Sequence, residues 1–159
     1  MKANIISLVM LIGGPFLAFS LIRLRRPSRK RILAALIAGL CVALINFLIE
    51  ALAAPYDVYY VRGLWPVFDS PLSRTIGWVF LGMTFVLASD ITKAMPHPRG
   101  AIAIYIIAGI LFGLITDYLG TRWLEFMTLG PNGNWLIIFL VWGTLIPGTI
   151  LVYRILSRA

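Results

Sequence analysis

Apolar residues form five long runs that are separated by short polar connectors. Each run is close to the roughly 20 residues that a helix needs to cross a bilayer. The runs are continuous, whereas the strands of a membrane β-barrel alternate. The pattern predicts an all-α, polytopic transmembrane helical bundle in which residues 1–159 form a single integral membrane domain. The five predicted spans are residues 4–22, 32–54, 74–95, 101–119 and 134–153.

Composition also favours lipid as the surrounding solvent. Apolar residues make up 60% of the chain and charged residues only 13%, against about 25% in an ordinary soluble domain. Mean hydropathy is +0.93. A soluble domain of this length has too little interior for so much apolar surface, and the single cysteine, Cys41, excludes an intrachain disulfide framework.

The distribution of basic residues predicts the orientation. The connector 23–31, the segment 93–100 and the C-terminal tail would lie on one side, with ten of the 14 Lys and Arg residues. The other side holds Lys2, Arg62, Arg74 and Arg122. Because basic residues are retained in the cytoplasm, we expect the N-terminus outside, the C-terminus inside, and a multi-pass location in the inner (cytoplasmic) cell membrane.

The first connector carries the densest positive charge. In a soluble protein a net charge of +8 would suggest nucleic acid, but here the basic residues lie between apolar runs. We expect this connector to fix the topology and to bind anionic lipid head groups on the cytoplasmic side, with no nucleic-acid partner. Its basic residues are Arg23, Arg25, Arg26, Arg29, Lys30 and Arg31.

Small and polar residues share one face of the second span. They are Ala35, Gly39, Ala43, Asn46 and Glu50, spaced by three or four residues. Small residues at this interval let helix backbones approach closely in lipid.

The fourth span repeats this arrangement. Gly109, Gly113 and Asp117 are spaced by four residues and also end in a carboxylate. We therefore expect the second and fourth spans to pack against each other and to bring Glu50 close to Asp117. The same small-residue faces are candidates for contact with a protein partner or a second copy of the chain.

Three interpretations of the outer polar residues are open. Arg62, Arg74 and Arg122 are predicted on the same side as the two carboxylates, so ion pairs could close the end of the bundle. The carboxylates could also act as an acid/base pair. A third possibility is a ligand-binding pocket for a small solute or lipid head group, formed by Asn46, Glu50, Arg62, Trp65, Asp117 and Arg122.

The remaining connectors suggest structural roles. The aromatic-rich segment 55–73 predicts an interfacial or re-entrant element, with a lid over an outer pocket as the alternative. Asp90 and Lys93 are one helical turn apart and predict an ion pair. The single histidine, His97, has no Cys or His cluster near it in the sequence, so we expect no metal and no cofactor, and no motif predicts a catalytic residue.

In its layout the chain resembles small five-span membrane proteins of spore-forming bacteria. The resemblance lies in the basic first connector, in Glu50 followed by Pro55-Tyr56, and in Asp117-Tyr118 with Trp135. It implies a membrane location but no particular activity.

A second resemblance is to small carotenoid-cyclase membrane domains. Glu50, Gly63-Leu64-Trp65 and Pro71 carry it, but the second acidic site of those domains has no counterpart in Ser70-Pro71-Leu72-Ser73. From the small-residue helix faces and the absence of catalytic motifs we expect a non-enzymatic structural or accessory subunit. The alternatives are a small transporter or lipid-handling protein with an outer-face pocket, or a membrane-embedded enzyme acting on an isoprenoid or lipid.

Overall fold

A computed structural model of the protein describes residues 2–68 and 70–158, and five long helices dominate it. Two short helical segments extend the third and fourth helices, η1 (Asp90–Ala94) and η2 (Gly120–Leu124). With these extensions, all five helices are long and apolar enough to cross a membrane, so the predicted helical class with five candidate spans is confirmed. The helices are α1 (Lys2–Arg25), α2 (Arg29–Ala53), α3 (Leu72–Ser89), α4 (Pro98–Leu119) and α5 (Trp135–Arg158).

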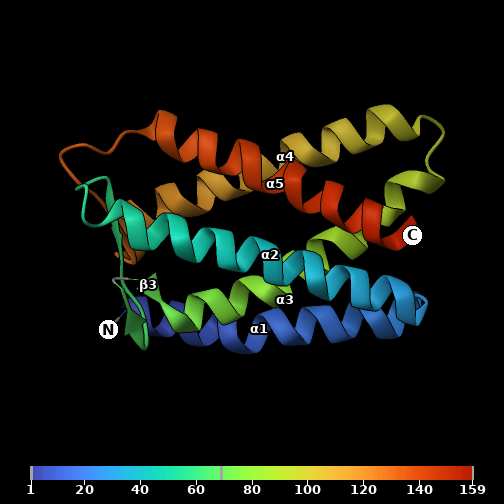
Figure 1. Cartoon of the computed structure of the whole chain (residues 1–159), viewed down its shortest axis with the longest axis horizontal. Coiled ribbons are helices and arrows are strands. Elements are labelled where there is room, and N and C mark those ends of the chain that lie inside the picture. Colours follow the sequence, from blue (N-terminus) through green and yellow to red (C-terminus); the bar gives the residue numbers. More distant parts are fainter. Residues whose placement is uncertain (1, 69, 159) are drawn as a thin grey trace.

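Local signals set several helix ends. Arg26 adopts a left-handed conformation with φ 47° directly after α1. Ser28 caps α2 by accepting a hydrogen bond from the Arg31 amide at 3.4 Å. Asn134 does the same for α5, since its Oδ1 accepts from the Ile137 amide at 3.0 Å. The connectors after α1 and after η1 are short, whereas those after α2 and η2 are longer. Consecutive long helices run antiparallel (Figure 1).

Four short strands occupy the other connectors. The strand β1 (Tyr59–Val61) pairs antiparallel with β4 (Met127–Leu129), and β2 (Pro66–Val67) pairs with β3 (Ser70–Pro71). The β1–β4 pair joins the connector after α2 to the connector after α4. Within the segment 55–73, residues 59–61, 66–67 and 70–71 thus form short paired strands, whose backbone hydrogen bonds satisfy part of its amides and carbonyls.

The two ends of the bundle differ in construction. The N-terminus and the strands lie at one end, here called the ribbon end, and the C-terminus lies at the other, the basic end (Figure 1). At the ribbon end, Lys2 donates a hydrogen bond to Glu125 at 2.8 Å. This ammonium group holds the pKa of the Glu125 carboxyl below its usual range, although both side chains are exposed and the pair adds little to stability.

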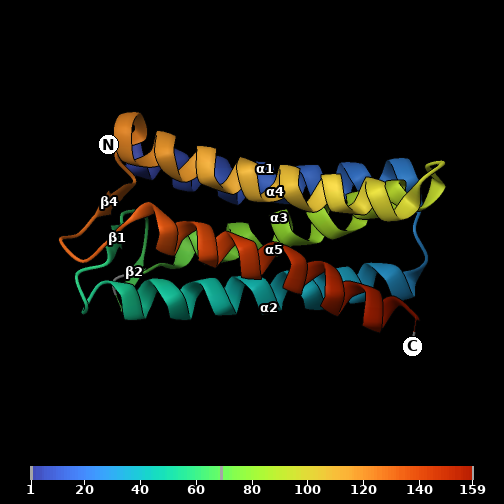
Figure 2. The same cartoon turned by 90° about the horizontal axis from the view of Figure 1, so that it is seen from above.

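The helix α3 is the central helix of the bundle. It packs along both α1 and α2, whereas α5 packs against α2 and α4 (Figure 2). Within the described chain α2 and α4 do not pack against each other, so the predicted contact between the second and fourth spans is wrong. The small face of α2 is used against α3 instead: Gly39 and Gly82 meet where these helices cross.

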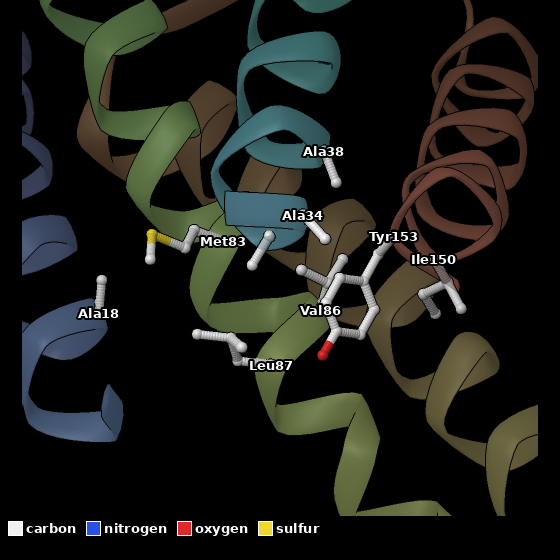
Figure 3. Packing of buried hydrophobic residues seen from close by; sticks show 9 residues of the cluster. Ala18, Ala34, Ala38, Met83, Val86, Leu87, Ile150 and Tyr153 are labelled. Atoms are coloured by element: carbon white, nitrogen blue, oxygen red, sulfur yellow. The ribbon is translucent and has the colours of Figure 1, made fainter. Parts of the chain in front are cut away.

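The apolar core is divided into two clusters. The cluster near the basic end joins α1, α2, α3 and α5, where Ala34 and Ala38 leave room for the fully buried Tyr153 ring (Figure 3). The second cluster lies near the ribbon end and includes the strand residues Tyr59 and Met127. The strands are therefore part of the core and not an appended loop.

The close crossing of α2 and α3 predicts a strong effect of one added methyl group at Gly39. An alanine Cβ there would lie 2.2 Å from the Val79 carbonyl oxygen, so the two backbones would have to separate. We expect Gly39→Ala to lower the free energy of unfolding by about 1–3 kcal/mol, as measured by denaturant titration in detergent micelles. The control is Gly13→Ala in α1, where nothing lies within 4 Å; equal effects of the two variants would contradict this packing.

Candidate functional site: a buried arginine between two carboxylates

Three charged side chains from three helices meet at the ribbon end. Glu50 lies in the last turn of α2, Arg74 in the first turn of α3, and Asp117 in the last turn of α4. Their side chains are only 2%, 9% and 7% exposed, respectively. Arg74 Nε lies 3.0 Å from Glu50 Oε1, and Arg74 Nη2 lies 3.6 Å from Asp117 Oδ1. We call these residues the charged triad.

Both carboxylate oxygens of Glu50 have hydrogen-bond donors. Asn46, one turn earlier on α2, donates to Oε1 at 2.7 Å. Ser70, on β3, donates to Oε2 at 2.7 Å. With Arg74 alongside, the negative charge of Glu50 is well compensated.

Asp117 is less well satisfied than Glu50. Trp142 on α5 donates its indole N–H to Asp117 Oδ2 at 2.7 Å. Oδ1 accepts no hydrogen bond from any described residue, and its contact with Arg74 is a long ion pair. The two carboxylates therefore face different electrostatic environments although they share one arginine.

Aromatic rings cover the triad. The Arg74 guanidinium carbon lies 5.1 Å from the centroid of the Phe126 ring, a cation–π contact. Burial raises the pKa of the nearby Tyr59 hydroxyl, and the Glu50 carboxylate raises it further. The phenol is therefore neutral at physiological pH and adds no charge to the site.

Glycines make room for the aromatic partners. An added Cβ at Gly113 would lie 2.3 Å from the Trp142 ring, and one at Gly120 would lie 2.4 Å from the Phe126 ring. Gly113 thus allows the indole to reach Asp117. Gly109, one turn earlier, lies against Phe85 of α3 and Ile146 of α5.

A small cavity lies beside the triad. Its volume is about 10 Å³, enough for about one water molecule. It is lined by Asn46, Glu50, Tyr59, Arg74, Asp117, Met127, Ile138, Val141 and Trp142.

The structure brings together half of the predicted pocket residues. Asn46, Glu50 and Asp117 line the cavity. Arg62, Trp65 and Arg122 are exposed and do not line it, so the cavity differs from the predicted pocket in these three members. The physical reason is that these three side chains, beside the strands and on η2, turn outward, while backbone pairing closes the end of the bundle.

Four residues that contact the triad or line its cavity were not predicted from the sequence. Ser70, Tyr59, Phe126 and Trp142 lie on β3, on β1, in the connector before β4 and on α5, respectively, and no spacing pattern links them to Glu50. Trp142 gave the one available signal, because an indole N–H deep in an apolar span needs an acceptor. Arg74 was expected only as one of three outer arginines, and it alone reaches the carboxylates.

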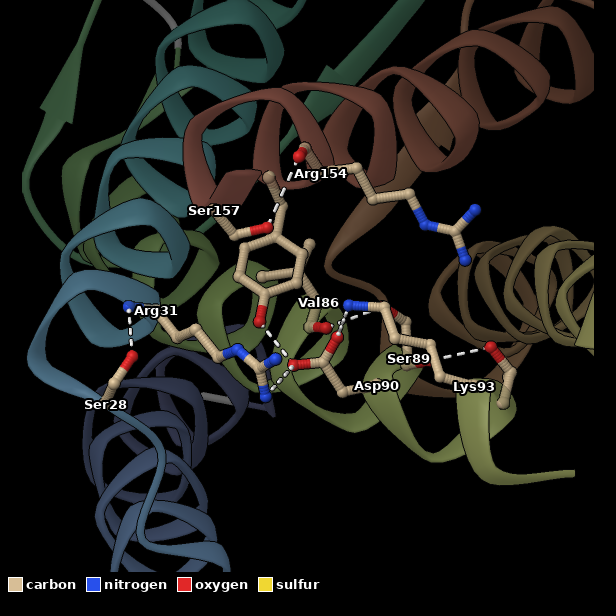
Figure 4. Close-up of polar contacts among 10 residues, drawn as sticks. Ser28, Arg31, Val86, Ser89, Asp90, Lys93, Arg154 and Ser157 are labelled. Carbon is tan, nitrogen blue, oxygen red and sulfur yellow. Dashed lines mark hydrogen bonds and ion pairs between the residues drawn. The ribbon is translucent and has the colours of Figure 1, made fainter. Parts of the chain in front are cut away.

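A second polar cluster lies at the basic end (Figure 4). Asp90 accepts hydrogen bonds from Tyr153 at 2.6 Å and from Lys93 at 2.5 Å, and Arg31 lies 3.8 Å away. The predicted Asp90–Lys93 pair is therefore confirmed. The basic residues predicted to bind lipid head groups are all exposed: Arg23, Arg25, Arg26, Arg29, Lys30 and Arg31.

Comparison of the chain with protein-family models, with curated proteins and with solved structures finds no match. The contacts and burial of the site are therefore the basis for inferring a function. Across residues 2–68 and 70–158, no group of three or more His, Cys, Asp and Glu side chains is arranged to hold a metal ion.

Removing the central arginine should destabilise the bundle strongly. Arg74→Met leaves the two buried carboxyl groups without the guanidinium between them, and we expect a loss of about 3–5 kcal/mol in the free energy of unfolding. Arg122→Met is the matched control, because Arg122 is exposed, and its effect should stay within about 0.5 kcal/mol. Adding Glu50→Gln and Asp117→Asn to Arg74→Met should recover part of the loss; no recovery would show that charge imbalance is not the cause.

Proposed function

We propose that this chain is a non-enzymatic structural or accessory subunit of the inner (cytoplasmic) membrane. The observation that carries the proposal is the closed triad: its side chains contact one another inside the protein, and the cavity beside it measures about 10 Å³. A cavity of that size accommodates about one water molecule and not a lipid head group or an isoprenoid. The triad therefore suits a role in holding the fold together.

The outer face of α4 supports a role beside another membrane protein. In the most apolar stretch of the α4–η2 span, only 11% of the residues are buried inside the protein. This share is smaller than in any other helix long enough to cross a membrane. Its side chains Ile104, Ile107, Leu111, Phe112 and Ile115 are exposed. We propose this face as the contact for a partner helix or a second copy, because the small-residue faces first expected to serve this purpose are buried inside the chain.

One observation favours lipid handling as the second candidate. An apolar cavity of about 140 Å³ lies between α2 and α5, and is lined by Cys41, Val42, Ile45, Thr144, Leu145, Gly148, Thr149 and Val152. It would take part of an acyl chain. This cavity shares no lining residue with the cavity beside the triad.

The proposed orientation can be tested with single cysteines in a Cys41→Ala background. Thr128, at the ribbon end, and His97, at the basic end, are both exposed. We expect Thr128→Cys to react with a membrane-impermeant maleimide in intact cells, and His97→Cys to react only after the membrane is opened. The reverse pattern would invert the orientation, and labelling of both in intact cells would contradict an odd number of crossings.

The proposed contact face can be tested by photo-crosslinking in native membranes. Phe112 on α4 and Phe16 on α1 are 71% and 69% exposed, so replacing each with a photoreactive phenylalanine gives a matched pair. We expect a discrete protein adduct at position 112 and only lipid adducts at position 16. Co-expression of differently tagged copies separates a second copy from another protein; lipid adducts alone at both positions would contradict the accessory role.

A further inference from the structure

The charged triad contains one more acid than base. A guanidinium is always protonated in proteins, so the fully ionised triad would carry a net charge of −1. A buried charge without a partner is costly, and such groups usually neutralise instead. The excess charge at this site therefore needs a positive counterpart.

No other described group facing Asp117 supplies that counterpart. On α3 the facing group is Arg74, already shared with Glu50 of α2. From α5 comes the neutral indole of Trp142, and from β1 the neutral phenol of Tyr59. Arg122, on η2, is exposed and does not line the cavity.

The two carboxylates are not equivalent in their ability to stay charged. Glu50 has Asn46 and Ser70 as donors, and its oxygen lies 3.0 Å from Arg74 Nε. Asp117 has one donor, and its Oδ1 is buried without a hydrogen-bond partner while the side chain lines the cavity. The unpartnered oxygen marks Asp117 as the acid that is less stable when ionised.

We propose that Asp117, which lines the cavity, is a proton-binding site that holds one proton at neutral pH on Oδ1, the oxygen without a hydrogen-bond partner. The proton comes from water at the ribbon end and adds to Asp117 Oδ1 to form a neutral carboxylic acid. This reduces the net charge of the triad from −1 to zero. The O–H is then a donor, and the cavity has room for about one water molecule to accept it. Trp142 continues to donate to Oδ2.

Because the proton balances an excess of acids over bases, changing the number of acids in the triad should change whether Asp117 is protonated. If Glu50 is replaced by Gln, one carboxylate faces one guanidinium, and Asp117 no longer needs the proton. In the Glu50→Gln variant, Asp117 should therefore lose its proton at neutral pH, although Asp117 itself is unchanged. A carboxylic acid kept neutral by burial alone would not respond in this way.

The test is infrared spectroscopy of the full chain in lipid bilayers at neutral pH. We expect a carbonyl-stretch band from one protonated carboxylic acid per chain, which shifts when aspartate side chains carry ¹³C at the carboxyl and does not shift with labelled glutamate. The band should disappear in Asp117→Asn and in Glu50→Gln. It should persist in Glu125→Gln, which removes an exposed carboxyl outside the triad.

Several outcomes would overturn the proposal. These are the absence of a protonated-acid band in the unmodified chain, a shift with labelled glutamate, or persistence of the band in Glu50→Gln. The isotope measurement uses the unmodified protein, so the proposal stays testable if a variant fails to fold. The result does not depend on whether α4 binds a partner.

Discussion

A guanidinium buried inside a helix bundle needs acidic partners within the protein, because burial removes it from water. Arg74 lies beside two carboxyl groups, on α2 and α4, helices that do not otherwise pack along each other. The first turn of α3 thus links the last turns of two other helices. The strands close over this contact, and Phe126 covers the guanidinium from the side of the connector. Because the interaction is buried and charge-assisted, it constrains how three helices meet.

Glycine positions decide whether that meeting is possible. Gly39 brings α2 onto α3, and Gly113 leaves the space that the Trp142 ring fills on its way to Asp117. Helix association in lipid depends on close packing and on hydrogen bonds between helices. Both occur here on the same helix faces, since Gly39 and Glu50 share a face of α2, and Gly113 and Asp117 share a face of α4. Packing and electrostatics therefore support the same arrangement.

The two ends of the bundle are closed by different means. At the ribbon end, backbone pairing between β1 and β4 joins connectors that are far apart in the sequence. At the basic end, side chains connect the helices. Asp90 accepts a hydrogen bond from Tyr153 of α5 and forms an ion pair with Arg31 of α2. The surrounding arginines are left exposed. The ribbon end is therefore covered by paired strands, whereas the basic end presents exposed charged side chains.

The sequence by itself predicted the five helices and their approximate ends, because each is a continuous run of apolar residues with about the length that a membrane span needs. It also identified Glu50 and Asp117 as polar residues that end small-residue faces. It did not determine which helix lies between them. The small-residue faces of α2 and α4 are both typical of packing surfaces. Nothing in their spacing shows that the neighbours of these faces are α3 and α5. Arg74 was selected over Arg62 and Arg122 only by the tertiary structure, because pairing depends on distances between side chains from separate helices, and helical periodicity describes one helix at a time.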